Sequence, residues 1–337
     1  MSERRTFHFL NVVRFLSAAW VVMAHLAASP LNKSVFSPEF EWLRKGLIVA
    51  FSGVSAVMVF FVVSGFCIHY PYASGRTFRS MPFYLQRLTR IGLPLLVAAV
   101  LHHYAGTFLW LKNVLWAVYC EIIYYALYPL LRIMLQRVGA YRLLLGSLVV
   151  SWLFCLQPDN GYGHIMAYQA GWTWLVCLPV WLCGCVLANW LAGSMTVPAF
   201  VSSMAKKIEG HLGLVRTGLW ALSSALLVLG IREIIPFKYS LPVSGLVVLV
   251  WLYAELQRTN QESWLSRFGL AGYSIYLMHP LAELPQLLQI SGTNPVIYWA
   301  LRLVLTVSVS VSFYFIVELP THRLARHFGG ARRGVSR

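Results

Sequence analysis

The sequence of 337 residues has few charged side chains and almost no aspartate. Asp, Glu, Lys and Arg together make up 11% of the chain, against roughly 25% in an ordinary soluble domain, and Asp159 is its only aspartate. Hydrophobic residues account for 58%, so there are too few polar side chains to cover a water-facing surface. This composition excludes a soluble enzyme and predicts an integral membrane protein.

The motifs of soluble metal, redox and nucleotide sites are also missing. The six cysteines lie inside apolar stretches, and Cys183 and Cys185 lack the spacing of a zinc or thioredoxin-like motif. The sequence contains no glycine-rich phosphate loop, internal repeat or low-complexity tract. The gaps between apolar runs are too short to fold as soluble domains. We therefore expect one polytopic unit with no bound metal.

Ten apolar segments approach or reach the length of a bilayer span. A membrane-spanning helix needs about 20 predominantly apolar residues, and the fifth and seventh segments are the shortest. The expected fold class is all-α, a polytopic membrane protein with about ten transmembrane helices. The segments lie at 9–28, 46–69, 91–109, 114–135, 143–156, 170–192, 217–231, 239–256, 268–288 and 296–317.

The 27 basic residues outnumber the 11 acidic ones, and their placement predicts the orientation. With the N-terminus in the cytoplasm, most Lys and Arg residues fall on the cytoplasmic side, as the positive-inside rule requires. Both termini and the loops 70–90 and 193–216 are then cytoplasmic. Topology explains the basic excess, so we expect no nucleic-acid partner. The basic residues expected outside are Lys33, Arg44, Lys45, Lys112, Arg232 and Lys238.

The first segment carries two ionisable residues, Arg14 and His25. An ionisable side chain inside the hydrocarbon is costly and needs a pairing or functional reason. Helical geometry places both residues on one side of the helix, roughly 16 Å apart along its axis. In the alternative interpretation, Arg14 extends to the lipid headgroups and His25 hydrogen-bonds a neighbouring helix.

A second group of candidates follows the second segment. Arg87 and Arg90, at positions i and i+3 of a predicted helix start, present two guanidinium forks that suit a phosphate group. From composition alone, they are better explained as ordinary positive-inside residues. Ser64 is a further candidate, although Ser64 and Gly65 also fit a small-residue contact between closely packed helices.

Later segments add acidic and histidine side chains. Glu121 is an intramembrane acid that would be protonated or bonded to a basic partner. His279 and Glu283 stand four residues apart on the predicted ninth helix, and Glu318 closes the tenth. Hydrogen bonds between helices are the simpler explanation for His279, Glu283 and Glu318, whereas Glu121 equally suits a bond to a basic partner such as Arg14 or His25.

Six short stretches of the sequence form a recognisable series. In chain order they are FLNVVRFLSAAWVVMAHL with Arg14 and His25, FFVVSGF, Arg87-x-x-Arg90, LWAVYCEIIYYALYPLL, YSIYLMHPL and VELP. Together they resemble the integral-membrane acyltransferase-3 family over about residues 7 to 322. Members O-acylate glycans, usually with acetyl groups, and a few act on antibiotics or lipids. Cys67 and His69 depart from the family, where aliphatic residues are usual, and only one of two frequent adjacent glutamates is present.

The resemblance implies a membrane acyltransferase domain over residues 1–322 and a basic cytoplasmic tail over 323–337. It implies an enzyme of the bacterial inner membrane that moves an acetyl group from acetyl-CoA to a hydroxyl of a cell-surface or exported glycan. Its partners are acyl-CoA, a glycan or lipid-linked glycan acceptor, and the bilayer. A transporter of an acylated or glycan substrate, with helices broken at Pro94, Pro179 and Pro280, is the alternative function.

The resemblance also distributes the candidate residues among roles. His25 and Glu121 are the expected catalytic residues. Neutral His25 is expected to be the base that deprotonates the acceptor hydroxyl, and in the alternative it accepts the acyl group itself. Ser64 and His279 are further candidates, and no metal is expected. Arg14, Arg87 and Arg90 are expected to hold the CoA phosphates at the cytoplasmic face.

Overall fold

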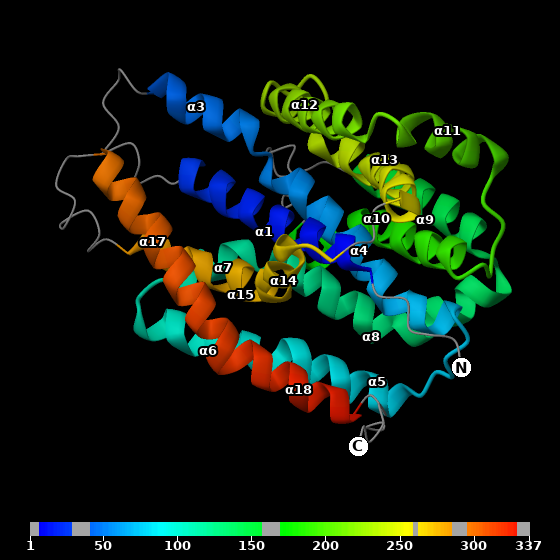
Figure 1. Cartoon of the computed structure of the whole chain (residues 1–337), viewed down its shortest axis with the longest axis horizontal. Coiled ribbons are helices and arrows are strands. Elements are labelled where there is room, and N and C mark those ends of the chain that lie inside the picture. The colour runs from blue at the N-terminus through cyan, green and yellow to red at the C-terminus, as the bar shows by residue number, and fades with distance from the viewer. Residues whose placement is uncertain (1–6, 29–40, 157–168, 259–261, 285–294, 329–337) are drawn as a thin grey trace. The chain divides into compact units, whose positions relative to one another are not determined.

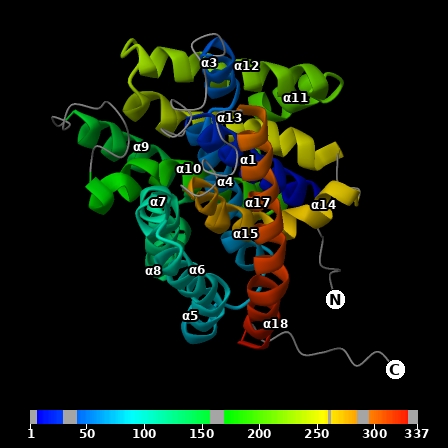
Figure 2. The ribbon, with the colours of Figure 1, turned by 90° about the vertical axis from the view of Figure 1, so that its left-hand side faces the viewer.

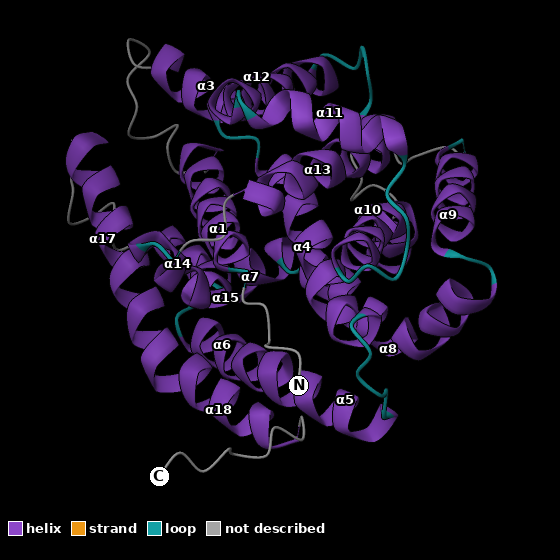
Figure 3. Cartoon of the chain, turned by 45° about the vertical axis from the view of Figure 1, so that its right-hand side comes forward, coloured by secondary structure: helices purple, strands orange, loops and turns teal. Residues whose placement is uncertain are grey.

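The computed structural model describes residues 7–28, 41–156, 169–258, 262–284 and 295–328, and within these ranges every element is a helix (Figures 1 and 3). The all-α fold class is therefore confirmed. The chain divides into two compact units, each built from separate segments. Unit 1 comprises Met1–Val21, Gly46–Arg76 and Trp116–Leu270, and unit 2 comprises Val22–Lys45, Thr77–Leu115 and Ala271–Arg337.

Eight helices among the described residues are long and apolar enough to cross a membrane, and they coincide with eight of the predicted segments. The predicted fifth segment is α9 (Ala140–Cys155), an apolar helix of shorter length. The polytopic architecture follows from these helices. Their bounds are His8–Ala27, Glu41–Ala73, Ser80–Tyr104, Trp116–Arg137, Gly171–Leu191, Leu212–Ile231, Phe237–Arg258 and Ile297–Phe328.

Unit 1 is built around α4 (Gly53–Ala73) and α10 (Gln169–Leu191), which pack closely together (Figure 3). A Cβ atom on Gly65 would lie 2.0 Å from the Trp181 carbonyl oxygen, and one on Gly184 would lie 2.1 Å from that of Val62. Only glycine permits this approach. The other helices of the unit are α8 (Trp116–Arg137), α9, α11 (Ala199–Glu209), α12 (Leu212–Ile231), α13 (Phe237–Arg258), α14 (Trp264–Phe268) and the start of α1 (His8–Ala28).

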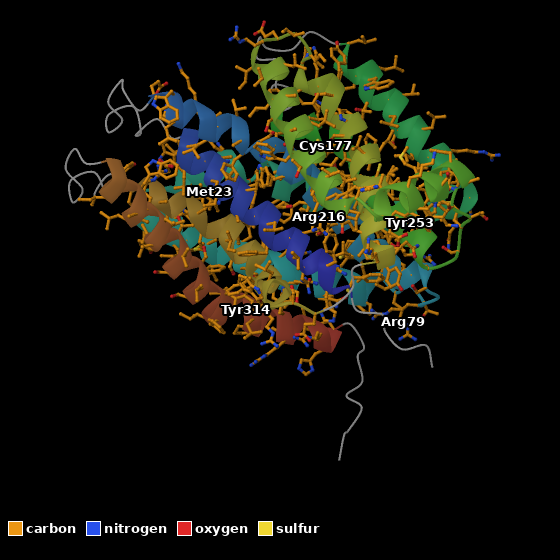
Figure 4. All side chains as sticks on the ribbon, turned by 45° about the horizontal axis from the view of Figure 1, so that its top comes forward. Met23, Arg79, Cys177, Arg216, Tyr253 and Tyr314 are labelled. Carbon is orange, nitrogen blue, oxygen red and sulfur yellow. The ribbon has the colours of Figure 1, made fainter. Side chains whose placement is uncertain are left out.

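Side chains on α12 and α13 extend the interior of unit 1. The Arg216 guanidinium donates to both carboxylate oxygens of Glu255, at 2.7 and 2.8 Å, and Trp251 Nε1 donates to the same carboxylate at 2.9 Å. Glu255 is fully buried, so this pairing supplies the partners that a buried carboxylate requires. Figure 4 labels Arg216 on this unit together with the buried Cys177 and Tyr253.

Unit 2 contains two long helices that are each interrupted by a π-helix. In the first, η2 (Leu88–Gly92) joins α5 (Ser80–Arg87) to α6 (Leu93–Tyr104). In the second, η6 (Tyr314–Glu318) joins α17 (Pro295–Phe313) to α18 (Leu319–Phe328), as Figure 2 shows from the side. Figure 4 labels Tyr314, where η6 begins. Such π-helical turns occur frequently at functional sites. The helix α7 (Phe108–Val114) follows α6.

The predicted ninth segment, 268–288, is not one continuous helix. It divides into α14, the 3-10 turn η4 (Gly269–Ala271), α15 (Gly272–Met278) and the 3-10 helix η5 (His279–Glu283). Pro280 ends α15, because proline lacks an N–H and its ring clashes with the preceding helical turn. The sequence predicted that His279 and Glu283 lie four residues apart on one α-helix. They lie in the 3-10 helix η5 instead. Pro179, in contrast, lies inside the continuous α10.

The segments predicted as cytoplasmic loops are partly helical. α4 continues to Ala73 and α5 begins at Ser80, while α11 lies within 193–216. The predicted boundary between domain and tail at 322/323 falls inside α18, which continues to Phe328. Asp159, Lys33 and the tail from residue 329 onward lie outside the described residues.

Candidate active site

Two histidines that are distant in sequence lie together in unit 2. The ring centroids of His25 and His279 are 4.9 Å apart and the ring planes are nearly perpendicular, at 80°. His25 lies near the C-terminal end of α1, two residues after Met23, which Figure 4 labels. His25 is exposed and His279 is 4% exposed. The structure thus joins a predicted catalytic residue to one of the further candidates, with one imidazole accessible and the other buried behind it.

The local sequence determines which nitrogen of His279 carries the proton. In an α-helix, the carbonyl of Tyr276 would accept from the N–H of residue 280, but Pro280 has no N–H. Nδ1 of His279 donates to the Tyr276 carbonyl instead, at 2.8 Å. Since a carbonyl oxygen only accepts, Nδ1 is protonated, and Nε2 of the neutral ring is a bare acceptor. Among the described residues, Nε2 has no hydrogen-bond partner.

A fully buried arginine connects the two elements that carry these histidines. Arg302 of α17 donates to the Leu26 carbonyl at 3.2 Å and to the Ala282 carbonyl at 3.1 Å. Leu26 follows His25 in the last turn of α1, where carbonyls have no partner within the helix. A cation at that position also interacts favourably with the helix dipole. Arg302 therefore fixes the end of α1 relative to η5.

The charge of Arg302 is balanced by Glu283, which accepts a short hydrogen bond from Nη2 of Arg302. The aromatic face of Tyr298 lies 5.2 Å from the guanidinium carbon. Sequence reasoning missed this pair, although it noted Glu283 as a possible helix-to-helix contact. The available signal was an arginine in the middle of the last apolar segment, because an intramembrane arginine requires a partner.

Hydrogen bonds from α6 and α15 hold the backbone around His279. The fully buried His102 donates from Nε2 to the Leu277 carbonyl at 3.0 Å, and its Nδ1 lies 2.8 Å from the Thr107 hydroxyl oxygen. The Tyr276 hydroxyl donates a short hydrogen bond to the Val114 carbonyl. His102 therefore has both ring nitrogens in hydrogen bonds, and it contrasts with His279 in this respect.

Arg87 and Arg90 lie at the junction of α5 and η2, both partly buried. The π-helix changes their relative direction from the regular i, i+3 spacing that the sequence predicted. Arg90 donates from Nε to Nε2 of His322 at 3.0 Å. The Arg87 guanidinium carbon lies 5.6 Å from the Phe83 ring centroid. Both guanidiniums are thus oriented by contacts within unit 2.

Further polar contacts fix the second π-helix. Glu318, the last residue of η6, accepts from the Ser274 N–H at 2.9 Å and from the Ser274 hydroxyl. Its other carboxylate oxygen lies 3.6 Å from Nε2 of His322. These contacts connect η6 and α15 to the side chain that holds Arg90. Glu318 therefore makes a hydrogen bond between two helical elements, the kind of contact that the sequence predicted for it.

A comparison with protein families decides the reaction class. The acyltransferase-3 model, described as an acyltransferase domain, matches residues 7–315. The chain belongs to this acyltransferase family. No match was found among curated proteins or among solved structures. The match covers all of η2, the first two residues of η6, and both His25 and His279. The site formed by the two histidines therefore belongs to an acyltransferase domain.

The remaining candidates of the acyltransferase lie in unit 1. Arg14 of α1 donates to Cys67 Sγ of α4 at 3.2 Å. Ser64 is buried and lies 3.1 Å from the Tyr125 hydroxyl, and Trp181 Nε1 donates to it at 3.3 Å. These contacts, next to the close approach of α4 and α10, favour a packing role for Ser64. Glu121 is partly buried on α8, one turn before Tyr125.

Within the described residues, no three His, Cys, Asp or Glu side chains are grouped so that they could hold a metal ion. The polar side chains around His25 are instead connected through backbone carbonyls and through the pair of Arg302 and Glu283. The arrangement is suited to proton transfer by an imidazole.

Proposed function

We propose that the protein is an O-acyltransferase of the bacterial inner membrane that moves an acetyl group from acetyl-CoA to a hydroxyl group of an exported or cell-surface glycan. Family membership supplies the reaction class. The observation that carries the assignment of the site is the accessible His25 with the buried His279 against it. An accessible imidazole suits general base catalysis on a hydroxyl group.

In this mechanism, His25 removes the proton from the acceptor hydroxyl as the oxygen attacks the carbonyl carbon of the thioester. A carbon–oxygen bond forms and the carbon–sulfur bond breaks, with its electron pair left on sulfur. The His25 imidazolium then returns its proton to that sulfur and releases a free thiol. The reaction is balanced, and the side chain returns to its neutral state for the next turnover.

Three arginines are proposed to hold the donor through its phosphate groups. Arg87 and Arg90 present guanidinium groups at the junction of α5 and η2, and Arg14 lies on α1, roughly 16 Å along the helix axis from His25. Guanidinium forks bind phosphate oxygens through paired, charge-assisted hydrogen bonds. The contact between Arg90 and His322 supports this role, because it orients the fork before a ligand arrives.

The remaining candidates take secondary roles in the proposal. Glu121 is a second catalytic candidate, through its place one turn from Tyr125 on α8. The acceptor is a glycan or a lipid-linked glycan that reaches His25 within the bilayer. No metal takes part in this mechanism, because the imidazole and the thioester suffice for acyl transfer.

The test is acyl transfer by the purified full-length protein in lipid nanodiscs. Acetyl-CoA labelled in the acetyl group is incubated with glycan extracted from cells that lack the protein. We expect the label on glycan hydroxyl groups by mass spectrometry, with one free thiol released per acetyl group transferred. Movement of an unmodified glycan across a vesicle membrane, without release of thiol, would instead favour a transporter and overturn the proposal.

A further inference from the structure

The Nε2 atom of His279 is a buried hydrogen-bond acceptor that the proposed mechanism does not use. The ring is 4% exposed, and its Nδ1 is committed to the Tyr276 carbonyl. A buried acceptor without a partner costs free energy, and Nε2 has none among the described residues. The rings of His25 and Tyr276 pack against His279, with the His25 centroid 4.9 Å away and the Tyr276 centroid 5.9 Å away.

We propose that His279 is the positioning residue for His25: Nε2 of His279 accepts a hydrogen bond from one ring N–H of His25, which leaves the other His25 nitrogen unprotonated as the base. This inference rests on the proposed function for its catalytic meaning. The ring centroids are close enough for this bond, which forms once the rings rotate from the edge-to-face arrangement that they have in the structure. A chain of Tyr276 carbonyl, His279 and His25 then determines the tautomer of the base.

The proton on Nδ1 makes this chain directional. His279 donates to a carbonyl that can only accept, so its Nε2 can accept but cannot donate while the ring is neutral. A base oriented by a third group is a recurring arrangement in enzymes, in which the third group is usually a carboxylate. Here a neutral imidazole takes that place. It avoids the large cost of burying an uncompensated negative charge in the hydrocarbon.

The same bond assists the step in which His25 becomes charged. Once His25 has taken the proton of the acceptor, its imidazolium has two N–H groups, and the one that faces His279 makes a charge-assisted hydrogen bond. Arg302 is the cation close to this site, since it donates to Leu26 next to His25. Its pairing with Glu283 balances that charge and lessens its repulsion of the imidazolium.

Two substitutions separate this role from a structural one. In His279→Asn, the amide nitrogen occupies the place of Nδ1 and keeps the bond to the Tyr276 carbonyl, but the acceptor at the place of Nε2 is lost. In His279→Gln, the amide oxygen occupies the place of Nε2 and accepts from His25, while the bond to Tyr276 is lost. A merely structural histidine predicts the better activity for Asn, and the proposal predicts it for Gln.

The experiment uses the full-length protein in nanodiscs, with acetyl transfer and the tautomer of His25 as readouts. We expect His279→Asn to lower kcat by about ten- to a hundredfold, because one hydrogen bond to a charged group is lost. Acetyl-CoA binding should be unchanged. His279→Gln should retain more activity. The matched control is His103→Asn on α6, an exposed histidine of the same unit, which should leave kcat unchanged.

Nitrogen NMR of ¹⁵N-histidine-labelled protein in bilayers gives the second readout, with the His25 signals assigned from their loss in His25→Asn. The proposal predicts one dominant His25 tautomer in the native protein and a mixture in His279→Asn. A mixture in the native protein overturns the proposal even if no His279 variant folds. So does a His279→Asn variant that is at least as active as His279→Gln. If the native protein transfers no acetyl group, the proposed function fails, whereas the NMR result still decides the pairing.

Discussion

Arg302 and Glu283 form the most buried ion pair among the described residues of unit 2. Such pairs contribute little net stability over apolar replacements, but removal of one partner leaves an uncompensated charge. Here the arginine also caps the carbonyl of Leu26 and that of Ala282. The pair therefore contributes to the position of His25, and each member needs the other because a single buried charge would be destabilising.

We predict that Arg302→Met destabilises the protein by about 3–5 kcal/mol, because Glu283 is left buried without its cation. The double variant Arg302→Met with Glu283→Leu should recover most of that loss, since no charge remains. Unfolding by denaturant in micelles measures both. The double variant should nevertheless transfer acetyl groups more slowly than the native protein, because the end of α1 has lost its anchor. Equal stability of the single and double variants would contradict the ion-pair argument.

A second residue-scale prediction concerns the donor. Each charge-assisted hydrogen bond to phosphate is worth about 1.5–3 kcal/mol, so Arg87→Ala and Arg90→Ala should each weaken acetyl-CoA binding by roughly ten- to a hundredfold. Lysine at either position should rescue only part of the loss, because the guanidinium fork is missing. Calorimetric titration with CoA measures the effect. Unchanged CoA affinity in the double alanine variant would remove these arginines from the donor site.

At the scale of elements, the sequence predicted where helices occur better than how they are interrupted. Hydropathy identifies the long apolar helices because their length is imposed by the bilayer. The break at Pro280 also has a sequence signal, since proline ends a helix. The π-helices η2 and η6 have no such signal in the sequence. They arise where a long helix accommodates tertiary contacts such as those of Arg90 and Glu318.

The candidate site shows the same division. Arg14 and His25 share α1, as their spacing predicted, because a helix fixes such relations locally. The contact between His25 and His279, and the anchoring by Arg302, join segments far apart in the sequence. Such pairings depend on how helices pack against one another, and the spacing of residues along the chain does not predict them.

The packing of α4 against α10 carries an element-scale prediction. Gly65→Ala should destabilise unit 1 by about 1–3 kcal/mol, the usual cost of overpacking, because the new Cβ meets the Trp181 backbone. The matched control is Gly146→Ala in α9, where a Cβ has open space and alanine favours the helix by up to about 1 kcal/mol. Thermal unfolding in micelles compares the two. A Gly65→Ala variant as stable as Gly146→Ala would contradict the close contact.

For the molecule as a whole, the distribution of basic residues carries the prediction of orientation, with both termini in the cytoplasm. In a variant whose six native cysteines are replaced, an impermeant thiol reagent added outside intact cells should label Lys112→Cys and miss Arg333→Cys. Lys112 is exposed on α7 and serves as the outer control. Labelling of Arg333→Cys from outside would reverse the orientation and remove the cytoplasmic route for acetyl-CoA.

The most direct test of the mechanism is the turnover of His25→Asn. The variant is expressed at the level of the native protein and assayed with labelled acetyl-CoA and glycan. If His25 is the base, turnover falls by about 10²–10⁴-fold, while membrane insertion and CoA binding are unchanged. If the imidazole only packs or hydrogen-bonds, asparagine retains most of the activity. Near-native acetyl transfer by His25→Asn would leave the mechanism without a base and contradict its central claim.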